Sequence, residues 1–154
     1  MSGDNGFSVN ATIRHATLDD AAAAAELLDV LGYPATHAQV EARIAGASAS
    51  AGTAIFVAEV SDLVVGLASF HRIPLFHEDG HLGRITSFVV APPLRKRGVG
   101  RQLIAAVEEY AWGHGCRRVE ITSGDHRADA HSFYERLGYA QESRRYQKRR
   151  GAPP

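Results

Sequence analysis

The sequence has very little cysteine and no excess of charge of either sign. Cys116 is the only cysteine among 154 residues, so no intramolecular disulfide can form and the chain suits a reducing compartment. Lysine plus arginine and aspartate plus glutamate number 17 each, and the formal net charge is zero. Without a net basic field, nucleic acid is not expected to be a partner of this protein.

Long apolar runs are absent as well. No stretch approaches the roughly 20 apolar residues of a membrane-spanning helix. The start lacks the basic segment of a signal peptide, and Ala21–Ala25 is too short for its apolar part. We therefore expect a cytoplasmic protein with no membrane partner. The length and the 45% hydrophobic content suit one domain over residues 7–150, preceded by a disordered N-terminus over residues 1–6.

The hydrophobic periodicity predicts a mixture of strands and helices. The segments expected to form strands are 7–14, 53–60, 63–73, 82–90, 117–122 and a last one from Tyr139. The expected helices begin at Thr17, at Thr36, behind residue 100 and at Ala130. Residues 45–52 are small and are expected to be flexible. This order predicts a mixed sheet with helices on both faces.

The most informative segment is a basic, glycine-rich loop between a strand and a helix. The apolar strand Ile85–Val90 runs into Pro92 and Pro93, and a helical pattern follows the loop. The N–H groups and the dipole of a helix start favour an anion, and Gly98 and Gly100 let a ligand approach the main chain. The basic side chains nearby are Arg95, Lys96, Arg97 and Arg101. The loop is therefore expected to bind a phosphate-bearing ligand.

This loop resembles the acetyl-CoA loop of the GNAT N-acetyltransferases. It is neither a Walker loop nor a dinucleotide fingerprint, because Leu103 stands where the fingerprint needs a third small residue. The GNAT pattern is Arg/Gln-x-x-Gly-x-Gly/Ala after a Val-x-Pro strand end. The residues that match it are Val90, Pro92, Arg95, Gly98 and Gly100.

A second segment is similar to the C-terminal GNAT pattern Ala-x-x-x-Tyr-x-x-x-Gly-Phe/Tyr. Its matching residues are Ala130, Tyr134, Gly138 and Tyr139. The segment Ile13–Asp20, followed by an Ala/Leu-rich helix, looks like a common GNAT opening. The resemblance therefore covers most of the chain and implies an α/β (α+β) fold, a GNAT-like mixed, mostly antiparallel sheet with helices on both faces in a single domain.

The resemblance also implies a reaction, which is acetyl transfer from the cosubstrate acetyl-CoA to a primary amine. In this family the strand here ending at Val90 splays from the next strand, and the pantetheine arm lies in the gap. The residues implied to bind acetyl-CoA are Phe88, Val89, Val90, Arg95, Lys96, Arg97, Gly98, Val99, Gly100 and Arg101. Arg127 stands where relatives often have Asn; it could reach a CoA phosphate or an acidic substrate, or be a surface residue.

Two residues are candidates for proton transfer. Tyr134 matches the family's general acid, a phenol close to the leaving thiolate. Many relatives carry a carboxylate just before the loop, but residues 84–88 of this chain contain none. Glu120, flanked by apolar residues, is a candidate general base; the alternatives are that it points to solvent or pairs with Arg118. His81 and Glu78 are further base candidates.

The last expectations from the sequence concern a metal ion, the acceptor and a second copy of the chain. The spacing of His71, His77 and His81 fits no compact zinc pattern, so no metal is expected and these histidines are assigned to a loop over the acceptor cleft. The expected acceptor is a small-molecule amine. The alternatives are a protein N-terminus or lysine, and a non-catalytic acyl-CoA-binding regulator. We expect a homodimer, in which Arg144, Arg145 and Arg149 need acidic partners such as Glu108 and Glu109.

Overall fold

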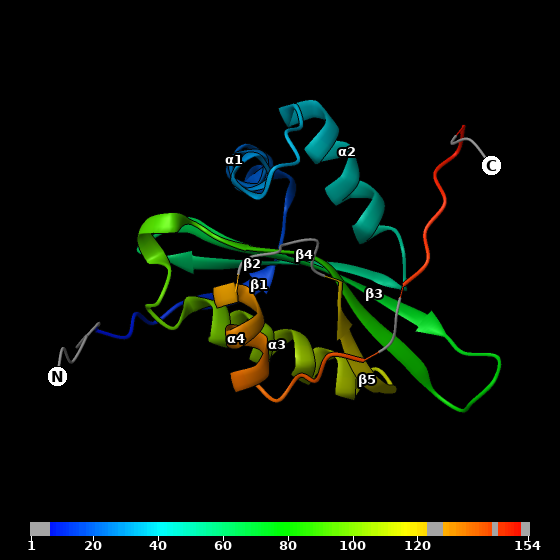
Figure 1. Cartoon of the computed structure of the whole chain (residues 1–154). Helices are drawn as coiled ribbons and strands as arrows, with labels where there is room; N and C mark the ends of the chain where they lie inside the picture. The colour runs from blue at the N-terminus through cyan, green and yellow to red at the C-terminus, as the bar shows by residue number, and fades with distance from the viewer. Residues whose placement is uncertain (1–6, 123–127, 143–144, 152–154) are drawn as a thin grey trace, which may run out of the picture. The chain divides into compact units, whose positions relative to one another are not determined.

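The computed structural model describes residues 7–122, 128–142 and 145–151 (Figure 1). The chain divides into two compact units, Met1–Ser123 and Gly124–Pro154. The first unit holds a sheet with three α-helices, and the second holds one described helix, α4, over Ala128–Arg136. Among the described residues, no helix has the length and apolar character needed to cross a bilayer.

The sheet of the first unit has five strands in the order β1-β2-β3-β4-β5. Their bounds are Thr12–His15, Thr53–Val60, Leu63–Pro74, His81–Val90 and Cys116–Ile121. The first three pairings are antiparallel, and only β4 and β5 run parallel. The expected mixed, mostly antiparallel sheet is confirmed.

Strand β4 has two differently paired halves. It pairs with β3 from His81 to Val90, but its pairing with β5 runs only from His81 to Ile85. The register with β3 shifts between Ser69 and Phe70, opposite Thr86, which is the mark of a β-bulge. Bulges bend a strand and locally disrupt its pairing. Before Thr86, β4 pairs with both β3 and β5, and after Thr86 it pairs only with β3.

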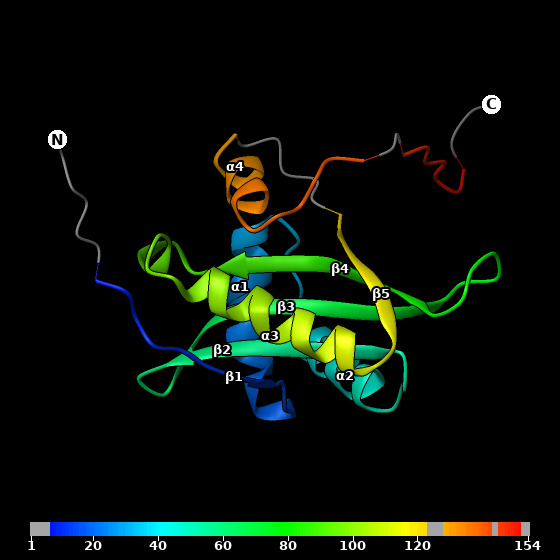
Figure 2. The same cartoon turned by 90° about the horizontal axis from the view of Figure 1, so that it is seen from below.

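Helices cover both faces of the sheet, as the order of elements predicts (Figures 1 and 2). Helices α1 (Ala21–Leu31) and α2 (His37–Ser48) lie on one face, and α3 (Val99–Gly113) lies on the other. Strand residues alternate between two buried clusters. The cluster beneath α1 and α2 includes Leu27, Ile44, Val57, Leu67 and Val89, and the cluster beneath α3 includes Phe56, Phe70, Ile85, Leu103 and Val107.

The helix ends follow local signals in the sequence. Thr36 caps α2, with its hydroxyl accepting a hydrogen bond from the Gln39 backbone N–H at 3.2 Å. Gly32 ends α1 in the left-handed region at φ 97°, a conformation that costs glycine least. At the start of α1 a single 3-10 turn, Leu18–Asp20, precedes the helix expected from Thr17.

Three segments differ from the sequence prediction. The first strand begins at Thr12 rather than at residue 7, because residues 9–11 bond to the loop region instead of to β2. Helix α2 continues through the small residues up to Ser48, and Ala47 within this stretch is buried. Residues 139–142 and 145–150, as described, contain no strand, so the expected last strand is not observed there. The segment is polar and almost wholly exposed, and it offers little apolar surface to hold it on a sheet.

Candidate functional site: a glycine-rich loop and a cavity on the sheet

The loop after β4 is shaped by two residues with left-handed backbone. A 3-10 turn over Pro92–Leu94 ends the strand, and Lys96 and Gly98 then take φ values of 61° and 84°. At Gly98, an added Cβ would lie 3.0 Å from the Ser8 hydroxyl in an already strained conformation. Glycine is therefore required at the turn into α3.

Helix α3 presents its N-terminal N–H groups to this loop. The first backbone bond that closes on the loop runs from the Gln102 N–H to the Gly98 carbonyl at 3.2 Å. The N–H groups of Val99, Gly100 and Arg101 precede it, at the positive end of the helix dipole. Lys96, Arg97 and Arg101 are exposed around them. This arrangement suits a phosphate or pyrophosphate.

The other residues expected to bind the cosubstrate are placed in three ways. Arg95 folds back, and its Nε donates to the Val90 carbonyl at 3.2 Å, so it fastens the loop to the strand end. Val89 and Val90 have buried side chains within the core on either side of the sheet. Phe88 packs against the α3 side of the core. Only the main chain of Val89 and Val90 can therefore meet a ligand.

The side chain of Gln102 links the start of α3 to the N-terminal segment, a role that its sequence position does not predict. Its amide nitrogen donates to the Val9 carbonyl at 2.7 Å, and its amide oxygen accepts from the Ala11 N–H at 3.0 Å. The Val9 N–H in turn donates to the Arg97 carbonyl at 2.8 Å. The N-terminal segment is thus hydrogen-bonded both to the loop and to the first turn of α3. These partners lie 88 to 93 residues apart, and no local pattern signals them.

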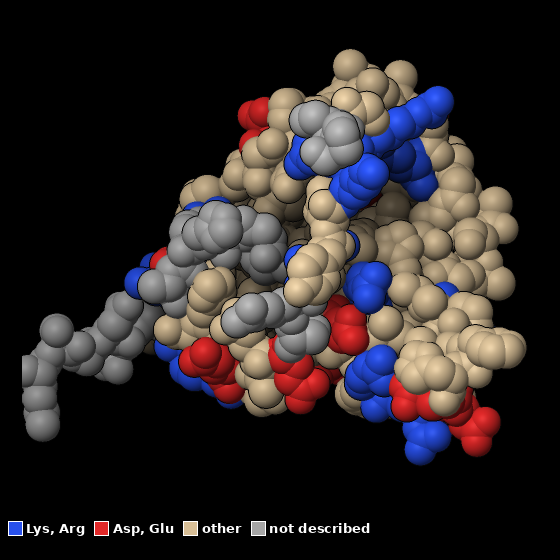
Figure 3. Space-filling model, turned by 45° about the vertical axis from the view of Figure 1, so that its right-hand side comes forward, with Lys and Arg blue, Asp and Glu red and all other residues tan. Residues whose placement is uncertain are grey.

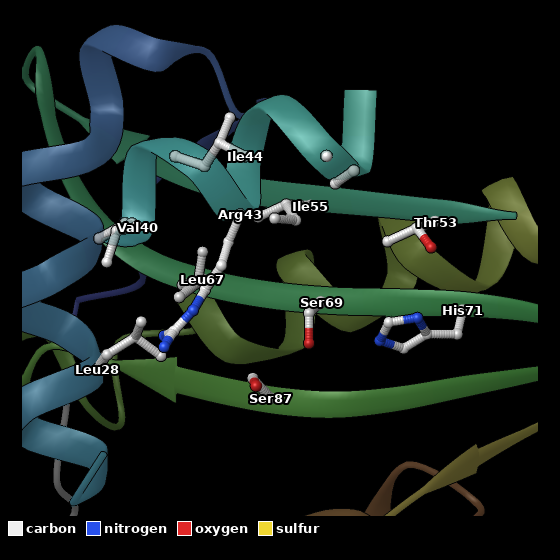
Figure 4. Close-up of a pocket in the computed structure, with 13 residues that line it drawn as sticks. Leu28, Val40, Arg43, Ile44, Thr53, Ile55, Leu67, Ser69, His71 and Ser87 are labelled. Atoms are coloured by element: carbon white, nitrogen blue, oxygen red, sulfur yellow. The ribbon is translucent and has the colours of Figure 1, made fainter. Parts of the chain in front are cut away.

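A cavity of about 370 Å³ opens on the opposite face of the sheet, between α1, α2 and strands β2 to β4 (Figure 4). Its apolar wall is made mainly by Ala24, Leu28, Val40, Ile44, Ile55 and Leu67. Its polar lining comes from Arg43, Thr53, Ser69, His71 and Ser87. The volume lies near the lower end of the range of small-molecule sites, about 300–1,000 Å³. A compact acceptor would fit it.

A hydrogen-bonded chain of three side chains borders this cavity. The Thr86 hydroxyl lies 2.9 Å from His71 Nε2 and 2.8 Å from the Ser69 hydroxyl. Burial, and then the charge of Arg84, hold the pKa of His71 below its usual 6.5. The imidazole is therefore neutral at pH 7 and can accept a proton. His71 lies inside β3, within the strand expected over residues 63–73, and not in the loop over the acceptor cleft to which it was assigned together with His77 and His81.

Glu120 is held in an ion-pair network. Its Oε2 accepts from Arg84 of β4 at 3.1 Å, and its Oε1 accepts from Arg118 at 3.3 Å. Arg118 also pairs with Glu78 of the β3–β4 loop, and this contact lowers the pKa of Glu78. Of the alternatives, pairing with Arg118 is the one observed. Acidic and basic side chains are likewise mixed in the lower part of the face drawn in Figure 3.

His81 lies far from the loop. It is the first residue of β4 and Val90 is the last, nine residues or roughly 30 Å along the strand. No described group of three or more His, Cys, Asp or Glu side chains is arranged to hold a metal ion.

Tyr134 belongs to the second unit. It lies in α4, and its carbonyl accepts from the Tyr139 N–H at 3.0 Å, beyond the end of the helix at Arg136. The Tyr134 ring contacts those of Phe133 and Tyr139. Arg127 and Arg144 lie outside the described residues, as does the expected disordered segment 1–6.

A strand that pairs with β5 only as far as Ile85, a glycine-rich loop and the helix that follows it form a recognisable arrangement, and comparison with known proteins identifies its family. A model of the acetyltransferase (GNAT) family matches residues 20–139. The chain therefore belongs to the GNAT acetyltransferase family.

Individual relatives agree with this assignment. An aminoalkylphosphonate N-acetyltransferase of Salmonella typhimurium is 40% identical over 85 residues, which are 55% of this chain and 55% of that protein. The match thus spans about half the length of this relative. An aminoglycoside N(6')-acetyltransferase type 1 of Stenotrophomonas maltophilia is 32% identical over 137 residues, 86% of this chain and 88% of the relative. The crystal structure of a Trypanosoma brucei acetyltransferase has a TM-score of 0.76 and 28% identity, covering 91% of this chain and 99% of its own.

Proposed function

We propose that this protein transfers an acetyl group from acetyl-CoA to the primary amine of a small molecule. One observation carries the proposal: β4 leads from the cavity, at Ser87, to the loop, which follows Val90. Three residues of a strand span roughly 10 Å, so a donor held by the loop would meet an acceptor in the cavity along β4. The names of the Salmonella and Stenotrophomonas relatives, which refer to small-molecule amines, support this acceptor class.

The loop would bind the donor through its pyrophosphate. The N–H groups of Val99, Gly100 and Arg101 would donate to the phosphate oxygens, and the exposed Lys96 and Arg97 would add charge. The main chain of Val89 and Val90 would border the pantetheine arm in the gap beside β4. Arg95 would act indirectly, by fixing the loop to the Val90 carbonyl.

The chemistry requires one proton acceptor and one proton donor. The amine nitrogen attacks the thioester carbonyl carbon, a C–N bond forms, and the C–S bond breaks. We assign to His71 the role of accepting the proton that the amine loses. When Nε2 is the unprotonated nitrogen of the ring, this proton would reach it through the hydroxyl of Thr86. Tyr134 is the proposed acid that protonates the leaving thiolate. With both oxygens of Glu120 bound by guanidinium groups, we give this residue a positioning role between β4 and β5.

The test is thiol release from acetyl-CoA across a panel of small amines and amine-bearing peptides. Turnover with small amines is expected. Release with peptides alone would favour a protein N-terminal or lysine acetyltransferase. CoA binding without any release would favour a non-catalytic acyl-CoA-binding regulator.

A paired substitution in α3 tests the loop. Gly100→Val places a branched side chain where the main chain should meet the phosphates, and we expect CoA affinity to fall about tenfold or more. Gly113→Val, at the other end of the same helix, is the control, since an added Cβ there meets nothing within 4 Å. Calorimetry with CoA measures both. Equal affinity in two folded variants would refute the assignment of the loop.

A further inference from the structure

Among the described residues that line the cavity, Arg43 is the one arginine or lysine. Arg43 extends from α2 into the cavity, and its guanidinium group lies near Leu28 and Leu67 (Figure 4). Among the described residues it forms no ion pair, whereas Arg14, Arg84 and Arg118 are all paired with carboxylates. Arg43 is an exposed residue that also lines this largely apolar cavity, so its guanidinium group is open to an anionic ligand that enters there.

We infer that the acceptor is a primary amine that also carries an anionic group, a carboxylate, phosphonate or phosphate, bound by Arg43. The inference rests on the proposed acetyl transfer and adds the chemical class of its acceptor. A planar guanidinium group can bind any of these oxyanions through two parallel N–H donors. A polycationic or neutral amine would leave the charge of Arg43 unmatched.

The arrangement of the lining residues also limits the length of the acceptor. Ser69 and Ser87 are register partners on β3 and β4, and both line the cavity next to the Thr86–His71 pair. Leu67, near which the guanidinium group lies, is two residues from Ser69, roughly 7 Å along the strand. An amine beside the serines and an anion beside Arg43 would therefore be separated by a short chain of about two to four carbons.

The apolar wall suits such a linker. Leu28, Val40, Ile44 and Ile55 offer no hydrogen bonds and would contact methylene groups. Removing methylene groups from water is favourable, so the wall favours an alkyl linker over a hydroxylated one.

Matched short amines test the inference. The substrates are propylamine, 3-aminopropanoic acid, 3-aminopropylphosphonate and 1,3-diaminopropane, each with acetyl-CoA. The enzymes are the wild type, Arg43→Gln and Arg117→Gln, the last removing an exposed arginine outside the cavity. The wild type is expected to prefer the two anionic amines. Arg43→Gln should lose roughly 10- to 150-fold in kcat/KM on these and little on propylamine, and Arg117→Gln should change neither.

Binding measured without turnover separates this inference from the proposed function. Calorimetry of 3-aminopropylphosphonate and 3-aminopropanoic acid is expected to show affinity that Arg43→Gln weakens, and the stronger ligand distinguishes the phosphonate from the carboxylate. Arg43-dependent binding with no acetylation of any amine would refute the proposed function and leave the anion site standing. Acetylation of propylamine or 1,3-diaminopropane as fast as the anionic amines, or equal losses on all substrates in Arg43→Gln, would overturn the inference.

Discussion

At the scale of single residues, His71 combines three properties that a base for an amine requires. It lines the cavity, its Nε2 is within hydrogen-bond distance of the Thr86 hydroxyl, and it is neutral at pH 7. Burial favours the neutral ring, and the nearby positive charge of Arg84 adds to that preference. His71 is therefore the proposed base on geometry and on protonation state together.

Replacing His71 with Gln is expected to lower kcat about 100-fold or more. Because the pKa of His71 lies below 6.5, wild-type kcat/KM should fall only as the pH drops below that value and the ring becomes protonated. This acidic fall should be absent from the pH profile of His71→Gln. Thr86→Val, which keeps the side-chain shape and removes the hydroxyl, should reproduce the lower kcat. An unchanged acidic fall in His71→Gln would assign it to another group.

The phenol of Tyr134 gives a second prediction at this scale. Tyr134→Phe removes only the hydroxyl and keeps the ring contacts with Phe133 and Tyr139. If the hydroxyl protonates the leaving thiolate, kcat should fall by about 10²- to 10⁴-fold with little change in the KM of acetyl-CoA. Tyr139→Phe is the matched control. Steady-state kinetics that leave kcat unchanged would make Tyr134 a packing residue.

At the scale of elements, the carboxylate of Asp20 connects the first 3-10 turn to β1 by binding Arg14. Arg14 in turn connects β1 to β2. The side chain of Asp20 is only 7% exposed, and its two oxygens accept from Arg14 at 2.8 and 2.9 Å. The Thr17 N–H donates to it as well, at 2.7 Å. Arg14 also binds Glu59 of β2 at 2.8 Å. These contacts, hydrogen bonding to Arg14 first, hold the pKa of Asp20 below 3.8.

Asp20→Asn is expected to lower the free energy of unfolding by roughly 1.5–3 kcal/mol at pH 7, the contribution of hydrogen bonds to a charged group. A pKa lowered by folding stabilises the protein above the unfolded value of about 3.8. The wild type should therefore lose this advantage as the pH falls below 3.8. Urea unfolding from pH 7 to pH 3 measures the difference. Asp19→Asn, an exposed neighbour, is the control, and equal losses in both variants would contradict the assignment.

Elements defined by local patterns could be predicted from the sequence. The hairpin of β2 and β3 follows from alternation around Ser61 and Asp62, and the loop before α3 follows from its prolines and glycines. The end of α2 could not be predicted, because residues 45–48 look flexible until the burial of Ala47 in the folded chain is known.

In the candidate site, too, the features set by local sequence patterns could be predicted, and the features set by tertiary contacts could not. The loop residues are contiguous and carry a pattern, so their arrangement could be anticipated. The pair of His71 and Thr86 joins two strands across a bulge, and the pair of Val9 and Gln102 joins segments 93 residues apart. Such contacts depend on register and on tertiary packing, which single-sequence periodicity does not contain.

At the scale of the whole molecule, the charge of the C-terminal segment is the basis of a last prediction, the homodimer. Residues 145–150 are exposed, and they include four basic side chains, Arg145, Lys148, Arg149 and Arg150. Like charges in so short a segment repel one another, so a second copy with acidic side chains would stabilise it. Glu108 and Glu109 of α3 are the proposed partners, and Glu109 is exposed.

Light scattering over a concentration series is expected to give twice the 16.6 kDa mass of the chain. Glu109→Arg should shift the equilibrium toward the monomer, because it replaces attraction by repulsion across the interface. Combining Glu109→Arg with Arg149→Glu should restore the dimer if the two side chains face each other in different copies. Added salt should weaken the wild-type dimer, because it screens exposed charges. A wild-type mass of 16.6 kDa at every concentration would remove the dimer without affecting the proposed acetyl transfer.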